Sequence, residues 1–426
     1  MRMGVINFIS TQIFGNAAFL FGIISLIGLL LLKKSFEDVI TGTVKTIVGV
    51  LILFAGCDVL SASVTPLGEW IKSVLGVQGV LPNALMMMSM VMSKYGAILG
   101  AVVVVGFLVN IIMARITKLK YIALVGHLFL NWGAFVVGTL VALNVSPAKI
   151  ILIGGIFCGI YFWLCTAATH HFMKKNENLT KDFALYIPEA TGIAFTSWFS
   201  SKVGNKENRC DDIKVPEKLE WLRDNVVGIA VLGAILWVLF GILVGKDVIA
   251  KSAGSTNWIL YLVTLGIKFS VGLSIVLYGV RMMLAEIVPA FRGIATKVVP
   301  GAIPGLDYPT IFQFSPNAVF VGFIANLIGG ILGTLVLVYL KAPVVVIPSV
   351  WTNFWMGSVL GVFGDAYGGR RGAILSNIIV GFVITFLWAV AYPMSGWCTT
   401  TGLLPDYTDY GVIGTIFEFI AKLIAK

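Results

Sequence analysis

Charged residues are scarce in this chain of 426 residues: Asp, Glu, Lys and Arg together make up only 12% of it. Soluble domains carry about a quarter charged residues, and the mean hydropathy here is +0.97. No charged residue occurs from Asn225 to Gly245, from Tyr308 to Leu340 or from Gly372 to Pro405. Because about 20 apolar residues span a bilayer as a helix, these runs predict a membrane protein and exclude a soluble globular domain.

The chain also lacks the patterns of a metal site, a disulfide framework or a β-barrel. Its five cysteines are scattered without a C-x-x-C spacing, and the pair His170-His171 has no further candidate ligands, so we expect no metal and no other cofactor. The uncharged runs show no strict alternation, which leaves helices as the spanning element. The first apolar run is too long for a removable signal and has no small-residue cleavage site, so we expect it to be the first span.

The expected fold is an all-α polytopic membrane protein with about eleven transmembrane helices. The expected spans lie near residues Thr11–Leu32, Thr46–Ala62, Tyr95–Ala114, Tyr121–Leu143, Ile150–Ala168, Val226–Gly245, Trp258–Val280, Ala318–Leu340, Val344–Phe363, Ala373–Tyr392 and Gly411–Ile424.

Basic residues gather in alternate loops, after spans one, three, five, seven and nine and at the end of the chain. The densest stretch runs from Lys202 to Arg223. Because positive loops stay in the cytoplasm, we expect the N-terminus outside and the C-terminus inside. The net charge of +10 then reflects membrane orientation and not nucleic-acid binding, with a weaker indication of an acidic or phosphorylated cytoplasmic partner.

Two apolar segments are too short to cross and are interrupted by Pro and Gly: Phe183–Ser201 and Val299–Pro316. We predict that they are re-entrant hairpins, since irregular backbone at membrane depth must be buried in protein or line a cavity. Surface amphipathic helices are the alternative. An internal repeat accompanies them: shifting the chain by 223 residues matches eight identities in 27 positions, including Gly49 with Gly272 and Gly56 with Gly279. This predicts two inverted repeats of five spans, an architecture of secondary transporters.

Few polar residues lie at membrane depth, and such residues usually face a cavity. Asp307 and Glu189 lie at the two hairpin tips, where a carboxylate accepts hydrogen bonds from sugar hydroxyls or acts as a general base. Alternatively, Asp307 caps a helix before Pro309 and Glu189 is a first-turn acid favoured by the helix dipole.

Other candidates lie on the spans and turns. His127 and Asn131 share one face of span four and suit hydroxyl recognition, although a single intramembrane His also bridges helices structurally. Asp58, beside Cys57, lies near the outer end of span two, where it binds substrate or simply reaches the interface. Asp365 is expected to serve a Gly-rich cytoplasmic turn.

Further polar and aromatic residues are possible lining groups. Thr310, Gln313 and Asn317 are expected to line the second hairpin, and one or two Trp side chains to stack on a sugar face. Most Trp residues are expected in the interfacial belts, namely Trp70, Trp132, Trp163, Trp198 and Trp258.

Several motifs resemble one family, the ascorbate-type membrane subunit (enzyme IIC) of the bacterial phosphoenolpyruvate-dependent phosphotransferase system. The resemblance covers nearly the whole chain and rests on Gly42–Gly49 with Ala55-Gly56, Gly126-His127, Gly279–Met282 with Ala285-Glu286, Ile303–Asp307 and Phe314–Val319. It implies a homodimer in the bacterial inner membrane. In each protomer, spans one, two, six and seven form a scaffold, and the other spans up to ten, with both hairpins, carry substrate by an elevator-like movement.

The resemblance also implies that the imported sugar is phosphorylated by a phosphocysteine of a cytoplasmic IIB subunit, itself supplied by IIA. We therefore expect no catalytic residue in this chain. Asp307 and His127 match the family, whereas Cys57 stands where the family has Ser and Asn131 where it has Gln. At the first hairpin, a run rich in His and Gln is replaced by Ala190–Ala194, which includes Thr191. Related galactitol-type subunits have Pro-His where this chain has Pro188-Glu189.

These departures predict the same transport machinery with a different sugar, sugar acid or polyol, since buried polar sites discriminate strongly. Expected domain boundaries are 1–94 and 225–298 for the scaffold, 95–224 and 299–397 for the core, and 398–426 for a short terminal helix. The alternatives are an ion-coupled secondary transporter that uses Asp307 or Glu189 and, from another class, a lipid-modifying enzyme. The enzyme lacks a clustered acid–base–metal constellation. Expected partners are the carbohydrate, the IIB subunit and membrane lipid, with no nucleic acid.

Overall fold

A computed structural model describes residues 17–75, 79–212, 225–297 and 299–424. Part of the first predicted span and part of the basic stretch after Lys202 lie outside these residues. The elements are α2 (Ala17–Leu31), α3 (Phe36–Leu75), β1 (Leu81–Pro82), α4 (Ala84–Ile116), β2 (Tyr121–Ala123), α5 (Gly126–Ala142), α6 (Pro147–Lys174), β3 (Ala184–Leu185), α7 (Ala190–Val203), α8 (Asn225–Val244), α9 (Lys246–Ala253), α10 (Trp258–Lys297), β4 (Ile303–Leu306), η3 (Tyr308–Phe314), α11 (Pro316–Tyr339), α12 (Val350–Ala391), η4 (Tyr392–Met394), α13 (Gly396–Thr401), β5 (Leu403–Leu404), η5 (Tyr410–Gly414) and α14 (Thr415–Ile424).

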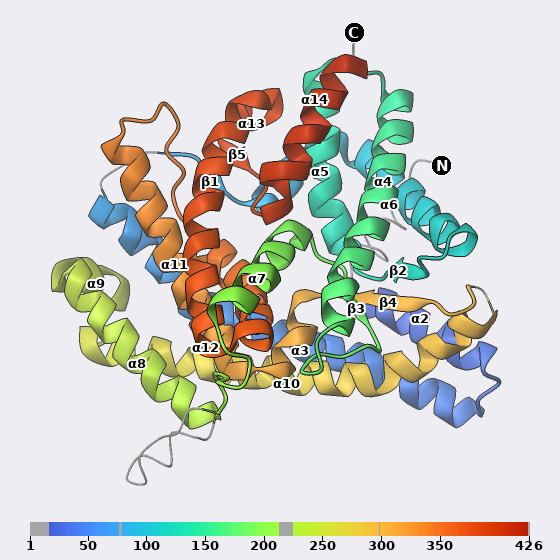
Figure 1. Cartoon of the computed structure of the whole chain (residues 1–426), viewed down its shortest axis with the longest axis horizontal. Helices are drawn as coiled ribbons and strands as arrows, with labels where there is room; N and C mark the ends of the chain where they lie inside the picture. The colour runs from blue at the N-terminus through green and yellow to red at the C-terminus, as the bar shows by residue number, and fades with distance from the viewer. Residues whose placement is uncertain (1–16, 76–78, 213–224, 298, 425–426) are drawn as a thin grey trace.

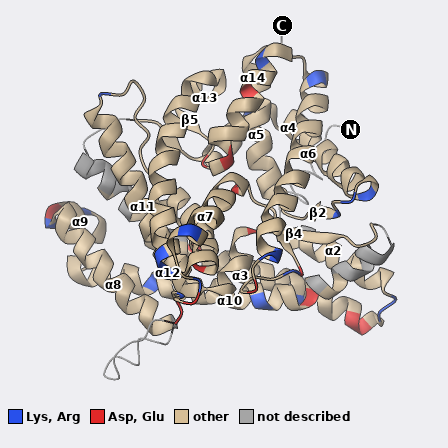
Figure 2. Ribbon diagram, viewed as in Figure 1, with Lys and Arg blue, Asp and Glu red and all other residues tan. Residues whose placement is uncertain are grey.

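The chain is an integral membrane protein with many apolar helices. Among the described residues, seven helices are long and apolar enough to cross a bilayer, and Phe21–Leu31 and Gly126–Ala142 are shorter apolar helices. Large apolar side chains stay exposed along the outer helices, for example Leu30 at 57% and Leu243 at 80%, as expected where lipid replaces water. Figure 2 shows charged residues mainly at loops and helix ends. The predicted helical membrane fold is confirmed at this level, while the count of eleven spans stays a prediction.

Helix α12 is two antiparallel arms and not one straight rod. Its backbone leaves the helical conformation at Gly368 and Gly369, and Gly369 has a φ of +59° that favours glycine. A Cβ built on Gly364 would lie 2.7 Å from the Cα of Ala373, although nine residues of straight helix would separate these atoms by about 13 Å. The chain therefore reverses at this Gly pair, between the segments predicted as spans nine and ten.

The long helices α3 and α10 lie against each other and cross the lower part of the view, whereas α4, α5 and α6 stand upright beside them (Figure 1). Both helices are 40 residues long with a single Pro in the C-terminal half, Pro66 and Pro289. Glycines let their backbones meet: a Cβ on Gly56 would lie 2.9 Å from the carbonyl oxygen of Gly272, and one on Gly49 would lie 3.1 Å from that of Gly279. Small residues permit this close packing in membrane helices.

A short parallel sheet of order β2-β4-β3 lies inside the helical fold, a detail that the prediction of an all-α membrane protein did not include. The expected span Tyr121–Leu143 begins as strand β2 and becomes helix only at Gly126. Each predicted hairpin consists of a strand followed by a helix, β3 with α7 and β4 with η3. Because Phe183 to Glu189 are all buried, the structure disfavours the alternative of surface amphipathic helices.

Candidate functional site

The strand pairing determines where the predicted site residues lie. Ala123 of β2 pairs with Gly305 of β4, and Leu185 of β3 pairs with Leu306. All three strands run parallel, so the residues that follow them emerge at the same edge of the sheet. These residues include His127, Asp307 and Glu189, which the sequence separates by 62 to 180 positions and which the sheet gathers around one cavity.

The cavity has a volume of about 240 Å³. Six of the nine predicted substrate-binding residues line it, namely Asp307, Glu189, His127, Asn131, Cys57 and Asp58. Its walls come from α3, the start of α4, α5, both hairpins, α12 and the segment after β5. This is the arrangement of a small-molecule site, a concave apolar space with a few convergent polar groups.

Asp307 and His127 form a carboxylate–imidazole pair in the cavity. The Oδ2 atom of Asp307 lies 3.3 Å from Nε2 of His127, while its Oδ1 accepts a hydrogen bond from the backbone nitrogen of Tyr308 at 2.8 Å. Asp307 therefore caps helix η3, as the alternative helix-capping interpretation expected, and it also presents its second oxygen to the cavity. Both side chains keep some exposure, 15% for Asp307 and 33% for His127, so a ligand can reach them.

Glu189 is a buried carboxylate that joins three parts of the chain. Its Oε1 accepts a hydrogen bond from the hydroxyl of Tyr308 at 2.9 Å, and its Oε2 accepts one from the backbone nitrogen of Thr408 at 2.9 Å. It precedes α7 but makes no capping hydrogen bond with its side chain. The alternative role as a simple first-turn acid therefore does not describe it, since its contacts run to the second hairpin and to the C-terminal segment.

Asn131 faces the cavity one turn after His127. Its Nδ2 lies 3.2 Å from the hydroxyl oxygen of Tyr407, and its Oδ1 is buried with no hydrogen-bond partner among the described residues. Since the two ends of an amide are assigned from such networks, either end of Asn131 is available to a ligand and the other to Tyr407. On the opposite wall, α3 contributes buried Cys57 and exposed Asp58.

Three predicted residues lie outside the cavity. The hydroxyl and backbone nitrogen of Thr191 donate to Asp409, at 2.6 and 2.7 Å. The Thr310 hydroxyl donates to the backbone oxygen of Asp307, and the side chain of Gln313 donates to the backbone oxygen of Thr310. These three residues stabilise the hairpins and do not line the cavity.

The sequence prediction missed the segment after β5, which contributes Asp406 and Tyr407 to the cavity. Asp406 accepts hydrogen bonds from the backbone nitrogen of Ala84 at 3.1 Å and the hydroxyl of Thr352 at 2.9 Å. Asp409, a few residues on, accepts from the Tyr161 hydroxyl at 2.7 Å. The sequence does contain a pattern that could have indicated this segment, because two acids lie in Pro405–Asp409 directly after the longest uncharged run. The prediction instead assigned residues 398–426 only to a terminal helix.

The cavity tryptophans also differ from those predicted. Trp351 and Trp355 of α12 line the cavity, with their ring centroids 5.5 Å apart. None of the five tryptophans singled out from the sequence lines it. Trp70 and Trp132 are buried in the core and Trp198 is exposed. Spacing cannot distinguish an interfacial tryptophan from a cavity tryptophan, because both lie near the ends of apolar runs.

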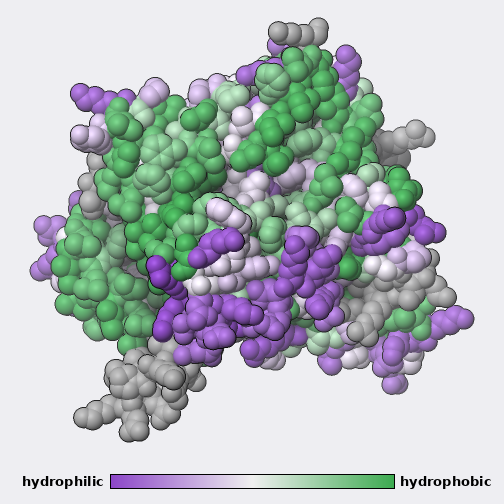
Figure 3. Space-filling model, viewed as in Figure 1, coloured by the Kyte–Doolittle hydropathy of each residue, from purple (hydrophilic) through white to green (hydrophobic). Residues whose placement is uncertain are grey.

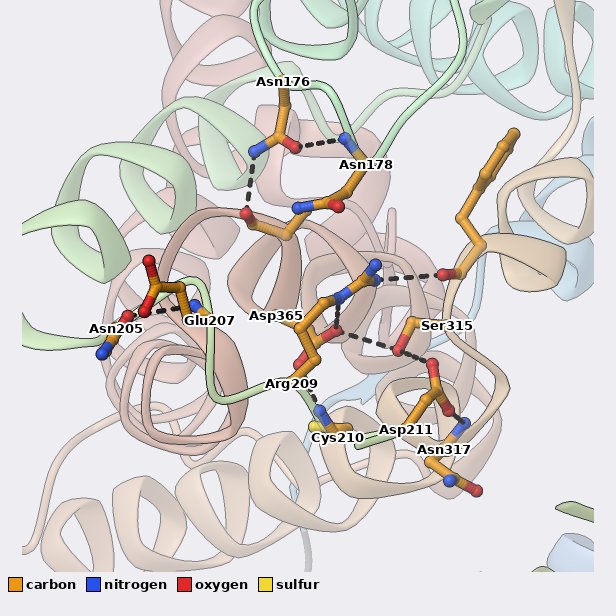
Figure 4. Close-up of polar contacts among 12 residues, drawn as sticks. Asn176, Asn178, Asn205, Glu207, Arg209, Cys210, Asp211, Ser315, Asn317 and Asp365 are labelled. Carbon is orange, nitrogen blue, oxygen red and sulfur yellow. Dashed lines mark hydrogen bonds and ion pairs between the residues drawn. The ribbon is translucent and has the colours of Figure 1, made fainter. Parts of the chain in front are cut away.

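A second polar cluster lies away from the cavity, where the loop after α7 contacts the reversal of α12 (Figure 4). Asp365 is fully buried and accepts hydrogen bonds from Nε of Arg209 at 2.9 Å and from the backbone nitrogen of Cys210 at 2.6 Å. The hydroxyl of Ser315 lies 3.0 Å from Asp365 and 2.6 Å from Asp211. The prediction that Asp365 serves a turn describes this geometry, since its contacts join the loop, α11 and the α12 reversal.

Asp211 completes this cluster by accepting from the backbone nitrogen of Asn317 at 3.1 Å. The Phe-Ser-Pro-Asn motif beginning at Phe314 therefore lies at the start of α11 and also contacts the loop. The Arg209 guanidinium donates a hydrogen bond to the backbone oxygen of Phe314 at 3.0 Å. Asn317, predicted to line the second hairpin, contacts Asp211 through its backbone and is absent from the cavity lining. Figure 3 shows hydrophilic surface gathered over this loop region, bordered by hydrophobic surface.

The sequence of this chain is similar to those of known proteins. A family model described as "PTS system sugar-specific permease component" matches residues 12–408. A curated protein of Mycoplasma pneumoniae, named "Ascorbate-specific PTS system EIIC component", is 28% identical over 419 residues, which cover 86% of this chain and 63% of that protein. The chain thus spans less than two thirds of the length of this relative.

Proposed function

We propose that this chain, which belongs to the family of sugar-specific permease components (enzyme IIC, ascorbate/galactitol type) of the phosphotransferase system, imports a small carbohydrate across the bacterial inner membrane and presents it to a IIB subunit for phosphorylation. One observation carries the proposal. The Asp307–His127 pair, whose side-chain atoms lie 3.3 Å apart, and residues of both strand–helix hairpins line the same cavity. The family to which the chain belongs carries sugars.

Substrate binding in this proposal rests on four residues. Asp307 accepts a hydrogen bond from a sugar hydroxyl, and His127 holds that carboxylate in place while it donates or accepts through its ring. Asn131 contributes the unpartnered end of its amide. Glu189 keeps the hairpin tips together through Tyr308 and Thr408, so that the site is formed before substrate arrives, which lowers the entropic cost of binding.

Transport in this proposal is an elevator-like movement of the core against the scaffold. The cavity supports this because one wall, with Cys57 and Asp58, belongs to scaffold helix α3, and the other walls belong to the hairpins and core helices. The close glycine packing of α3 on α10 favours a rigid scaffold. A core that slides past such a surface would carry Asp307 and His127 with it and leave Asp58 behind.

An inverted repeat is the symmetry that we propose for this movement. The offset of 223 residues matches Gly49 with Gly272 and Gly56 with Gly279. In the packing of α3 on α10, Gly49 instead contacts Gly279, and Gly56 contacts Gly272. Each glycine thus meets the counterpart of the other, which is the pattern that a two-fold relation between two halves produces. Such symmetry lets one sequence pattern form both the inward and the outward state.

The proposed orientation has the N-terminus outside and the loop around Arg209 in the cytoplasm. Exposed Lys202, Lys206, Arg370 and Arg371 lie at or near this loop, which follows the positive-inside rule. The IIB subunit, charged by IIA, would approach from this side. We further propose a homodimer, as the family resemblance implies, with exposed apolar helix faces divided between the partner protomer and lipid.

The experiment is an uptake assay in membrane vesicles that contain this chain, with and without the cognate IIB and IIA proteins and phosphoenolpyruvate. The expected result is accumulation of phosphorylated sugar only when the phosphorylated partner is present. Accumulation of unmodified substrate, driven by a proton gradient alone, would instead identify an ion-coupled secondary transporter. An IIB variant with its reactive Cys changed to Ser is the matched control, because it removes phosphoryl transfer and leaves docking in place.

A further inference from the structure

The basic residues around the α12 reversal differ in whether the protein pairs them. Arg209 and Lys206 each donate to a carboxylate, at 2.9 and 3.0 Å. Arg370 and Arg371 are exposed, and their guanidinium groups have no hydrogen-bond or ion-pair partner among the described residues. Both arginines line a second cavity of about 330 Å³, between the end of α7, the loop after it and the α12 reversal. Two unpaired cations therefore border a space that a ligand can enter.

We propose that this cavity binds the phosphate headgroup of an anionic phospholipid, and that an acyl chain of the same lipid lies in an apolar groove between α7 and the second arm of α12. Arginine binds phosphate through two parallel hydrogen bonds and keeps its charge at any physiological pH. Asn205 and Asn208 also line the cavity, and their amide NH₂ groups can donate to phosphate oxygens. The proposal concerns the lipid around the transporter and not the transported solute.

The groove lies on the same two helices as the cavity, since α7 packs against α12 (Figure 1). Its volume is about 200 Å³, its lining includes Phe195 of α7 with Val383 and Leu387 of α12, and no lining residue is charged. The hydroxyls of its two threonines, Thr191 and Thr408, make hydrogen bonds within the protein. A groove of this composition favours a hydrocarbon chain over a polar ligand.

The position of Trp198 indicates that the cavity lies near the membrane interface. Its side chain is 58% exposed on α7, one turn before exposed Lys202, and exposed tryptophans concentrate at the membrane–water boundary. Along α12, Ile379 and Val383 follow Arg371 by 8 and 12 positions, which is about 12 and 18 Å of helix. One leaflet with its headgroups is about 20 Å deep, so a lipid with its phosphate at Arg371 reaches the groove with an acyl chain.

Charge complementarity favours a lipid of the cytoplasmic leaflet. In the proposed orientation the cavity faces the cytoplasm, where the leaflet carries anionic lipids and where basic pockets between helices bind their headgroups. Figure 2 shows basic segments where the end of α7 meets the α12 reversal, and Figure 3 shows hydrophobic surface bordering this hydrophilic region. A free phosphate ion would contact the arginines and leave the groove empty, whereas a phospholipid fills both.

Native mass spectrometry of the purified full chain in detergent measures the binding of individual lipids. The probes are dioleoyl phosphatidylglycerol, which has one negative charge, and dioleoyl phosphatidylcholine, which has the same acyl chains and no net charge. Inorganic phosphate and glycerol 3-phosphate present a phosphate group without acyl chains. We expect phosphatidylglycerol to bind about tenfold or more tightly than phosphatidylcholine, and to stay bound when either soluble phosphate compound is added at the lipid concentration.

A double variant tests the headgroup site. Arg370→Gln combined with Arg371→Gln should weaken the binding of phosphatidylglycerol about fivefold or more. The control combines Arg115→Gln with Lys118→Gln, which removes two exposed cations at the end of α4 that do not line the cavity. Binding to the control should stay within about twofold of the parent value.

A bulky residue tests the groove. Val383 is 44% exposed, so Val383→Trp fills the groove without disturbing the core, and it should weaken the binding of phosphatidylglycerol about fivefold or more. The control is Val390→Trp, two turns further along α12, where Val390 is 67% exposed and absent from the groove lining. In thermal unfolding, phosphatidylglycerol should stabilise the parent and both controls more than the two site variants, because a ligand that binds the folded state raises its stability.

Three results would overturn the proposal. The first is equal binding of the two lipids, or equal losses in a site variant and its control. The second is displacement of phosphatidylglycerol by inorganic phosphate or glycerol 3-phosphate, which would identify a site for free phosphate. The third is a loss in the arginine variant without a loss in Val383→Trp, which would identify a surface for headgroups or an acidic protein and no acyl-chain site. Neither the sugar nor the IIB subunit enters these assays, so the proposed function is tested separately.

Discussion

The carboxylate of Asp409 accepts hydrogen bonds from both the backbone nitrogen and the hydroxyl of Thr191, which lies 218 positions earlier in the chain. Its other oxygen accepts from the backbone nitrogen of Ala190 at 3.1 Å and the hydroxyl of Tyr161 at 2.7 Å. The C-terminal segment thus supplies the cap that the first turn of α7 does not receive from Glu189, and it fixes the tip of the first hairpin beside the cavity.

Replacing Asp409 should destabilise this hairpin. Asp409→Asn replaces a carboxylate that accepts several hydrogen bonds by a neutral amide, whose NH₂ group faces one of the donors. This change should lower the free energy of unfolding by about 2 to 3 kcal/mol. Thermal unfolding of the purified protein measures the loss. Thr191→Val is the graded comparison, because it removes only the hydroxyl bond and should cost about 1 kcal/mol. Equal stability of Asp409→Asn and the parent would refute a capping role.

Replacing Asp307 should affect binding and not folding. Asp307→Asn keeps the side-chain volume and the cap on Tyr308, but it removes the charge that accepts from His127 and the substrate. Affinity for the identified substrate should fall about 100-fold, with the oligomeric state unchanged in size-exclusion chromatography.

Gln313→Ala is the control for Asp307, because the Gln313 side chain donates to the backbone oxygen of Thr310 and is absent from the cavity lining. Its affinity should stay within about threefold of the parent value. A loss as large as that of Asp307→Asn would show that Gln313 contacts substrate in another state of the transporter.

The loop cluster around Asp365 should be important for stability. Arg209→Ala leaves the buried Asp365 carboxylate without its cation, and breaking a buried pair in this way costs about 3 to 5 kcal/mol. Lys206→Ala provides the contrast, because the Lys206–Glu177 pair, at 3.0 Å, is exposed and is screened by solvent, so its loss should leave the unfolding temperature almost unchanged. Unfolding temperatures of the two variants test this difference, and similar values would contradict it.

The crossing of α3 and α10 should tolerate no side chain at its glycines. A Cβ on Gly56 would lie 2.6 Å from the backbone nitrogen of Val276, so Gly56→Ala must separate the helices and should cost about 1 to 3 kcal/mol. Gly396→Ala is the matched control, since a Cβ there meets only the Cβ of Ala142 at 3.4 Å. Thermal stability should distinguish the two variants, and equal unfolding temperatures would contradict this account of the crossing.

Individual site residues show how far the sequence prediction reached. Asp307, Glu189 and His127 were identifiable because an acid or imidazole in an apolar segment is rare, and the structure brings all three to one cavity. Thr191 and Gln313 were not separable from them, because small polar residues at a hairpin satisfy the backbone as often as they face a ligand. Asp406 was missed because it belongs to no apolar segment of its own.

The sequence by itself determined the membrane environment, the approximate position of the apolar helices and the family. Uncharged runs of sufficient length can be accommodated only in lipid or in the protein interior, and the motifs are local. Only the tertiary structure decided which polar groups meet. The pairing of β4 with β2 and β3 brings His127 and Glu189 to Asp307, and the segment after β5 adds Asp406, Tyr407 and Asp409. These contacts join residues up to 322 positions apart, and no local pattern specifies them, because they arise from packing between distant segments.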